Sequence, residues 1–67
     1  MMVELNGNAT ELAERATLAD AVAAAGANEP RGVAAALDGD VVPRAEWGTR
    51  RLAEGQSVEV VRAVQGG

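Results

Sequence analysis

Two turn dipeptides, Asn6-Gly7 and Asp38-Gly39, constrain the fold of this chain more than any other feature of its sequence. Each stands between two short runs that are rich in valine, leucine or alanine. Asn-Gly and Asp-Gly are preferred at the centre of type I′ turns, because both central residues of such a turn need a positive φ angle. The sequence therefore predicts two β-hairpins.

The runs on both sides of these turns alternate in the manner of half-buried strands. Val3 and Leu5 share one face of the first run, and residues 8–12 return from the first turn. Residues 33–37 lead into the second turn, and the run after that turn stops at Pro43. Proline has no N–H to give to a sheet ladder, so we expect the second hairpin to end there.

A helix is predicted between the two hairpins, over residues 17–26. Thr17 is a suitable N-cap, and Asp20 three residues later completes a weaker form of the capping box. Gly26 suits the position just beyond the helix, where a left-handed residue often ends it. Four apolar residues fall on one face of this helix: Leu18, Ala21, Val22 and Ala25. We expect this face to pack on a sheet.

The order of the predicted elements is β-β-α-β-β-β, because a last strand is expected over residues 57–64. This order predicts the α+β class, with one helix packed on one face of a mixed sheet. We expect the last strand to lie beside the first. At this length the chain is expected to form a single domain over residues 1–67.

One face of the predicted sheet has no helix to cover it. If Val58 and Val60 face the helix, then Val61 and Ala63 point to the opposite face. Ala34 and Ala36 fall on that opposite face too. These four residues are therefore candidates for a small apolar docking surface, and the alternative is that they are ordinary scattered surface residues.

The composition argues against most kinds of active site. The chain contains no cysteine and no histidine, so it offers no thiol nucleophile, thiolate ligand or imidazole base. Its net charge of −4 argues against nucleic-acid binding. No signal peptide or membrane-spanning run is evident. We therefore expect a cytoplasmic protein with no catalytic residue, no metal, no bound cofactor and no membrane partner.

The region after the second hairpin carries two features with two readings each. Arg44, Arg50 and Arg51 form a basic cluster, which is either a solvated loop surface or a contact for an acidic groove on a partner. Trp47 is the only aromatic residue of the chain. It either closes one end of the core or serves as a binding anchor. We favour the solvated surface for the arginines and core packing for Trp47.

The chain ends with Gly66-Gly67, which is either a frayed terminus or a functional tail. A C-terminal carboxylate becomes electrophilic when ATP activates it as an acyl-adenylate, and a sulfur or amine nucleophile can then attack it. Glycine has no Cβ, so a tail of two glycines can pass through a narrow channel into another enzyme. On the tail alone, the two readings are evenly balanced.

The segment VAAALDGDVVPRAEW, followed by EGQSVEVVRAVQGG, resembles the sulfur carrier proteins of thiamine biosynthesis. Pro43-Arg44 and Trp47 at these offsets, together with the terminal glycine pair, make the resemblance specific, and it covers essentially the whole chain. It implies the ubiquitin-like β-grasp fold, which agrees with the element order predicted above.

The resemblance also implies a reaction at the C-terminus. In this family, an adenylating enzyme related to ubiquitin-activating enzymes joins the terminal carboxylate to AMP, using ATP and magnesium. Sulfur from a persulfide donor displaces AMP and leaves a thiocarboxylate, from which thiazole synthase takes the sulfur. By matching position, Gly67 carries the acyl-adenylate and then the thiocarboxylate, and Gly66 provides a slender approach. The resemblance implies a flexible tail over residues 65–67, and the protein is expected to be a monomeric substrate rather than an enzyme.

Three alternatives remain open from the sequence. The nearest is the small subunit of molybdopterin synthase, which uses the same fold and thiocarboxylate to form a dithiolene. Another is a ubiquitin-like modifier that is joined to lysines of other proteins. The last is an interaction module whose tail has no role. The Pro-Arg-x-x-Trp run and the short length favour the thiamine pathway.

Overall fold

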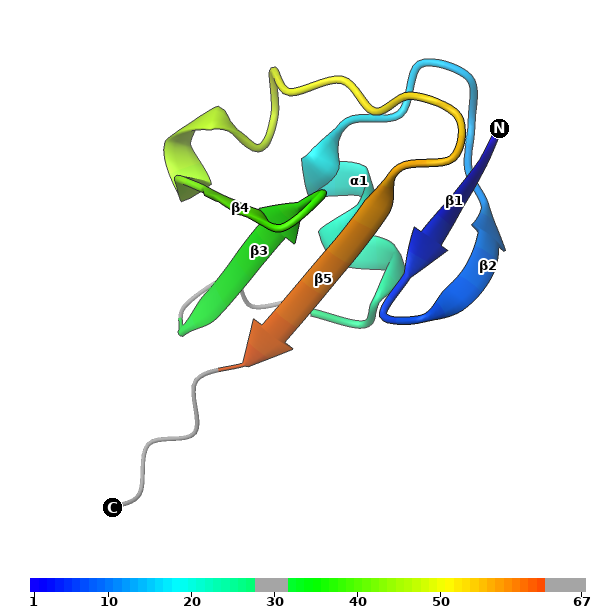
Figure 1. Cartoon of the computed structure of the whole chain (residues 1–67). Coiled ribbons are helices and arrows are strands. Elements are labelled where there is room, and N and C mark those ends of the chain that lie inside the picture. The colour runs from blue at the N-terminus through cyan, green and yellow to red at the C-terminus, as the bar shows by residue number, and fades with distance from the viewer. Residues whose placement is uncertain (28–31, 63–67) are drawn as a thin grey trace.

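The computed structural model describes residues 1–27 and 32–62 of the chain (Figure 1). The elements of this described part are β1 (Met2–Leu5), β2 (Asn8–Glu11), α1 (Leu18–Ala24), β3 (Val33–Leu37), β4 (Asp40–Val42), the 3₁₀ turn η1 (Arg44–Glu46) and β5 (Ser57–Arg62). This order confirms the predicted β-β-α-β-β-β arrangement.

The five strands form one mixed sheet in the order β2-β1-β5-β3-β4. The last strand, β5, is central: it runs parallel to β1 and antiparallel to β3. Figure 1 shows α1 lying across one face of this sheet, while no helix within residues 1–27 and 32–62 covers the other face. The fold is the ubiquitin-like β-grasp, and the expectation that the last strand lies beside the first is confirmed.

Both turn dipeptides adopt the conformation that their sequences predict. The φ angles are +50° at Asn6 and +85° at Gly7, and they are +50° at Asp38 and +90° at Gly39. Positive φ at both central residues is the requirement of the type I′ turn. β1 pairs with β2 and β3 pairs with β4, both antiparallel, so both predicted hairpins are confirmed.

The helix begins and ends where its capping residues predict, but it ends at Ala24, one residue before the last residue of the predicted apolar face. The N–H of Thr17 donates to the Asp20 carboxylate at 2.8 Å, and Gly26 has a φ of +88° beyond the helix. The prediction that Ala25 lies on the buried face is wrong, since Ala25 is the exposed C-cap. The chain turns back at Gly26, and Ala27 is buried instead.

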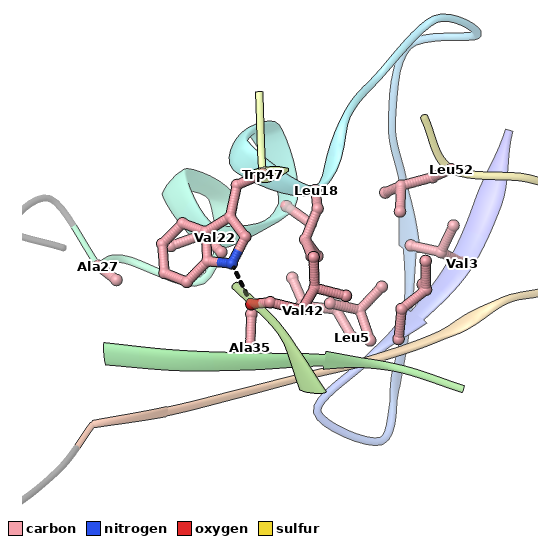
Figure 2. Close-up of a cluster of buried hydrophobic side chains, with 12 residues drawn as sticks. Val3, Leu5, Leu18, Val22, Ala27, Ala35, Val42, Trp47 and Leu52 are labelled. Carbon is pink, nitrogen blue, oxygen red and sulfur yellow. Dashed lines mark hydrogen bonds between the residues drawn. The ribbon is translucent and has the colours of Figure 1, made fainter. Parts of the chain in front are cut away.

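The core lies between α1 and the covered face of the sheet (Figure 2). Leu18 on the helix and Val58 on β5 are both fully buried, at 0% exposure. Trp47 closes one end of the core at 5% exposure, and its indole Nε1–H donates to the Val42 carbonyl at 2.9 Å. The interpretation of Trp47 as a packed side chain is confirmed.

Candidate functional site

The predicted docking residues lie on the face of the sheet that α1 does not cover. Ala34 and Val61 are register partners on β3 and β5, and Ala36 follows two residues after Ala34. Register partners and alternate residues of a strand point to the same side of a sheet, so the three side chains share a face. Val61 is 62% exposed, Ala34 is exposed and Ala36 is half-buried. The fourth predicted residue, Ala63, lies outside the described residues.

Val41 belongs to the same surface, and the sequence analysis did not assign it a face. It is the register partner of Ala36 on β4 and is 74% exposed, whereas its neighbour Val42 is buried. Because Val41 and Val42 are both apolar, no alternation of apolar and polar residues shows which of them faces the core. Counting back from the two-residue turn, with Leu37 opposite Asp40, would have placed Val41 correctly. We call Ala34, Ala36, Val41 and Val61 the outer patch.

The charged residues that share a face with the outer patch are all acidic in the strands that the structure describes. Glu59 is the register partner of Ala36 and therefore lies at the edge of the outer patch. Glu4 is the partner of Ser57, further back along β5, and Glu11 lies on β2. Opposite charges steer association and set specificity. A complementary surface would therefore combine an apolar centre with a basic rim.

The arginine cluster lies outside the strands of the outer patch, on the connection between β4 and β5. Arg44, Arg50 and Arg51 are all exposed, which agrees with a solvated surface. Arg50 contacts the Glu46 carboxylate at 3.6 Å, and both side chains are about half exposed. A pair of this kind contributes little to stability.

The strand that leads to the C-terminus is bonded on both edges. The N–H of Val60 donates to the side-chain oxygen of Asn6 at 2.8 Å, and the N–H of Ser57 donates to the Asp38 carboxylate at 2.9 Å. The sequence analysis assigned Asn6 and Asp38 only a turn role. No local signal reveals these contacts, because the bonded residues are 54 and 19 positions apart in the chain.

Gly66 and Gly67 follow β5 in the sequence and lie outside the described residues, as does the whole predicted tail over residues 65–67. Within residues 1–27 and 32–62, no pocket and no group of three or more histidine, cysteine, aspartate or glutamate residues that could hold a metal is present. No helix in that part of the chain is long and apolar enough to cross a membrane. The outer patch is thus a surface and not a cavity.

Comparison with known proteins identifies a family and a solved structure of the same fold. The model of the ThiS family matches residues 3–67. The crystal structure of the thiamine biosynthesis protein (ThiS) from Geobacter metallireducens superposes with a TM-score of 0.81, at 23% sequence identity over 100% of both chains. No curated protein sequence matched the chain. At this identity, the solved structure supports the fold alone.

Proposed function

The chain belongs to the ThiS family, and we propose that it is a sulfur carrier of thiamine biosynthesis whose C-terminal Gly67 carries the sulfur as a thiocarboxylate. The observation that carries this proposal is the family match, which extends through Gly67. The match also confirms the resemblance noted in the sequence, and it favours the thiamine pathway over the molybdopterin alternative.

The proposed reaction proceeds in a partner enzyme, with this protein as its substrate. A carboxylate oxygen of Gly67 attacks the α-phosphorus of ATP, pyrophosphate leaves, and an acyl-adenylate forms. The outer sulfur of a persulfide donor then attacks the acyl carbon and AMP leaves, which gives an acyl disulfide. A second thiol attacks the inner sulfur of that bond, so that a disulfide forms and the C-terminal thiocarboxylate is released, with one oxygen of the carboxylate exchanged for sulfur. Thiazole synthase is the proposed acceptor of that sulfur. ATP and magnesium belong to the adenylating partner, and the carrier supplies the carboxylate on an approach that Gly66 keeps slender.

An intact-mass measurement tests this proposal. The protein is incubated with the adenylating enzyme, ATP, magnesium and a persulfide source. The expected product is the free protein with one oxygen replaced by sulfur. Isopeptide adducts with other proteins would support a ubiquitin-like modifier instead, and an unchanged mass would contradict both. Copurification with thiazole synthase, and not with a molybdopterin synthase large subunit, would assign the pathway.

We propose that the outer patch docks the adenylating partner. Of its two exposed valines, Val61 lies on β5 and Val41 lies on β4, two strands away in the sheet. In the sequence, β5 is the last strand before Gly67. Apolar surface rimmed by charge is typical of protein–protein contacts. Docking at this place would bring the C-terminal residues to the partner's active site without any contribution from the arginine cluster.

Replacement of Val61 by glutamate should weaken binding to the adenylating enzyme without unfolding the domain. The change removes an exposed apolar side chain and adds a carboxylate near Glu59. The new carboxylate would face the apolar centre of the partner surface, which we expect to be basic only at its rim. We expect the dissociation constant to rise about fivefold or more, the effect of losing a contact worth at least about 1 kcal/mol. Calorimetric titration measures the binding, and circular dichroism checks the fold.

Ala45→Glu is a matched control for this substitution. Ala45 is also exposed, but it lies in η1 and not on the outer patch. It adds the same charge, so any general effect of net charge appears in both variants. Docking at the outer patch would be contradicted if Val61→Glu left the affinity for the adenylating enzyme unchanged. It would also be contradicted if Ala45→Glu lowered that affinity as much as Val61→Glu does.

A further inference from the structure

We propose that Asn6 is a positioning residue that aligns the end of β5, and through it the Gly67 carboxylate, for reaction in the adenylating partner. This inference rests on the proposed sulfur-carrier function. It assigns a role in the reaction to a residue that lies at the opposite end of the sequence from the reacting group.

The first observation is that Asn6 extends the sheet beyond the end of β1. The strand pairing of β1 with β5 ends at Leu5, opposite Val58. Asn6 then donates its backbone N–H to the Val58 carbonyl at 2.8 Å. Its side-chain oxygen accepts the N–H of Val60, also at 2.8 Å. Asn6 alone thus makes the two hydrogen bonds to this edge of β5 that a longer β1 would make with its backbone.

The second observation is that the other edge of β5 is already paired as far as the described chain extends. β3 pairs with β5 through Arg62, which lies opposite Val33. In the described residues, the end of β5 is therefore held by a strand on one edge and by Asn6 on the other. Without the Asn6 side chain, the last residues of β5 would be bonded by β3 alone and could rotate about that edge.

The direction of β5 at Arg62 sets where the following residues 63–67 begin. An error of about 1 Å in the position of a reacting group can cost about two orders of magnitude in rate. Alignment at Val60 should therefore affect the chemical step more than it affects docking, because the outer patch keeps all of its side chains. The expected signature is a lower kcat for adenylation with little change in KM.

Asp38 provides an internal control for Asn6. It occupies the same position in the second turn, with the same φ of +50°, and its carboxylate likewise accepts a β5 N–H, that of Ser57, at 2.9 Å. It bonds the start of β5, however, and not the end that leads to Gly67. Glycine is tolerated at this position of a type I′ turn. Asn6→Gly and Asp38→Gly therefore each remove a side-chain bond to a β5 N–H and keep both turns, and Asp38→Gly also removes the bond that the Gln56 side chain donates to Asp38 at 3.0 Å.

The experiment measures ATP–pyrophosphate exchange by the adenylating enzyme with the full chain as substrate. For Asn6→Gly we expect kcat to fall about two- to tenfold, the factor that corresponds to one net hydrogen bond, with KM unchanged. Asp38→Gly should retain wild-type kcat. Asn6→Asp keeps an oxygen acceptor and should restore most of the loss. Amide exchange followed by NMR should show a protected Val60 N–H in the wild type and faster exchange in Asn6→Gly.

Several results would overturn the inference. These are an equal loss of kcat in both glycine variants, a loss that appears only in KM, a failure of Asn6→Asp to restore the rate, or an unprotected Val60 amide in the wild type. The last measurement needs no variant, so it holds even if Asn6→Gly does not fold. A wild-type protein that supports no exchange would contradict the sulfur-carrier function itself, whereas an active wild type with an unaffected Asn6→Gly contradicts only the role of Asn6.

Discussion

Deletion of Gly67 should abolish adenylation and thiocarboxylate formation. The shortened chain would still end in a glycine carboxylate, but that carboxylate would lie one residue back, a displacement of about 3.3–3.6 Å along an extended chain. Because an error of about 1 Å in the position of a reacting group can cost about 10²-fold in rate, we expect a loss of at least that size. ATP–pyrophosphate exchange measures the first step, and intact mass measures the final product.

The same deletion should leave the stability of the domain unchanged. Among the residues that the structure describes, the core cluster extends from Val3 to Val58, and Gly67 has no side chain to bury. Thermal unfolding followed by circular dichroism should therefore give the wild-type midpoint.

Gly67→Ala is the matched control, because it keeps the chain length and the carboxylate and adds only a Cβ. An intermediate loss for this variant would indicate that the partner's channel is narrow. Thiamine synthesis that stays intact after deletion of Gly67, with no thiocarboxylate formed, would show that Gly67 does not carry the sulfur. It would favour an interaction module over a sulfur carrier.

The hairpins and the helix were predictable because their signals are local. Asn6-Gly7 and Asp38-Gly39 determine their turns through the φ angles of two adjacent residues. Thr17 begins the helix through a bond to a residue only three positions away. Such features need no knowledge of the rest of the fold, and all of them were confirmed.

The features that sequence reasoning missed depend on distant pairing. The exposed face of Val41 follows from its register with Ala36. The bond between Asn6 and Val60 exists because β1 and β5 meet as parallel neighbours, although they lie at opposite ends of the chain. Ala25 was misplaced because its helical periodicity continues past the point where the chain turns at Gly26.

β5 connects the stability of the domain with its proposed function. Val58 on this strand is fully buried in the core, and Val61 three residues later is exposed on the outer patch. The strand is bonded by β1 and β3 on its two edges. A defect anywhere in the core is therefore expected to reach the docking surface and the C-terminal residues through β5, so stability and sulfur transfer must be measured together for each variant.

Replacement of Trp47 by alanine should unfold most of the protein. Trp47 is 5% exposed and is the only aromatic residue available to fill its end of the core. Large-to-small substitutions of a buried tryptophan cost about 3–5 kcal/mol. A small core such as this one rarely supplies more than about 3–5 kcal/mol in total. The free energy of unfolding should therefore fall close to zero, as measured by urea denaturation followed by far-ultraviolet circular dichroism.

Trp47→Phe separates packing from hydrogen bonding at the same position. Phenylalanine keeps an aromatic ring in the core but cannot donate to the Val42 carbonyl, which accepts the indole N–H at 2.9 Å in the wild type. Loss of one hydrogen bond costs about 0.5–1.5 kcal/mol, and the smaller ring adds some loss of packing. This variant should remain folded but measurably less stable. If Trp47→Ala instead unfolds with nearly the wild-type free energy, the indole does not support the core, and its alternative role as a binding anchor would become the better explanation.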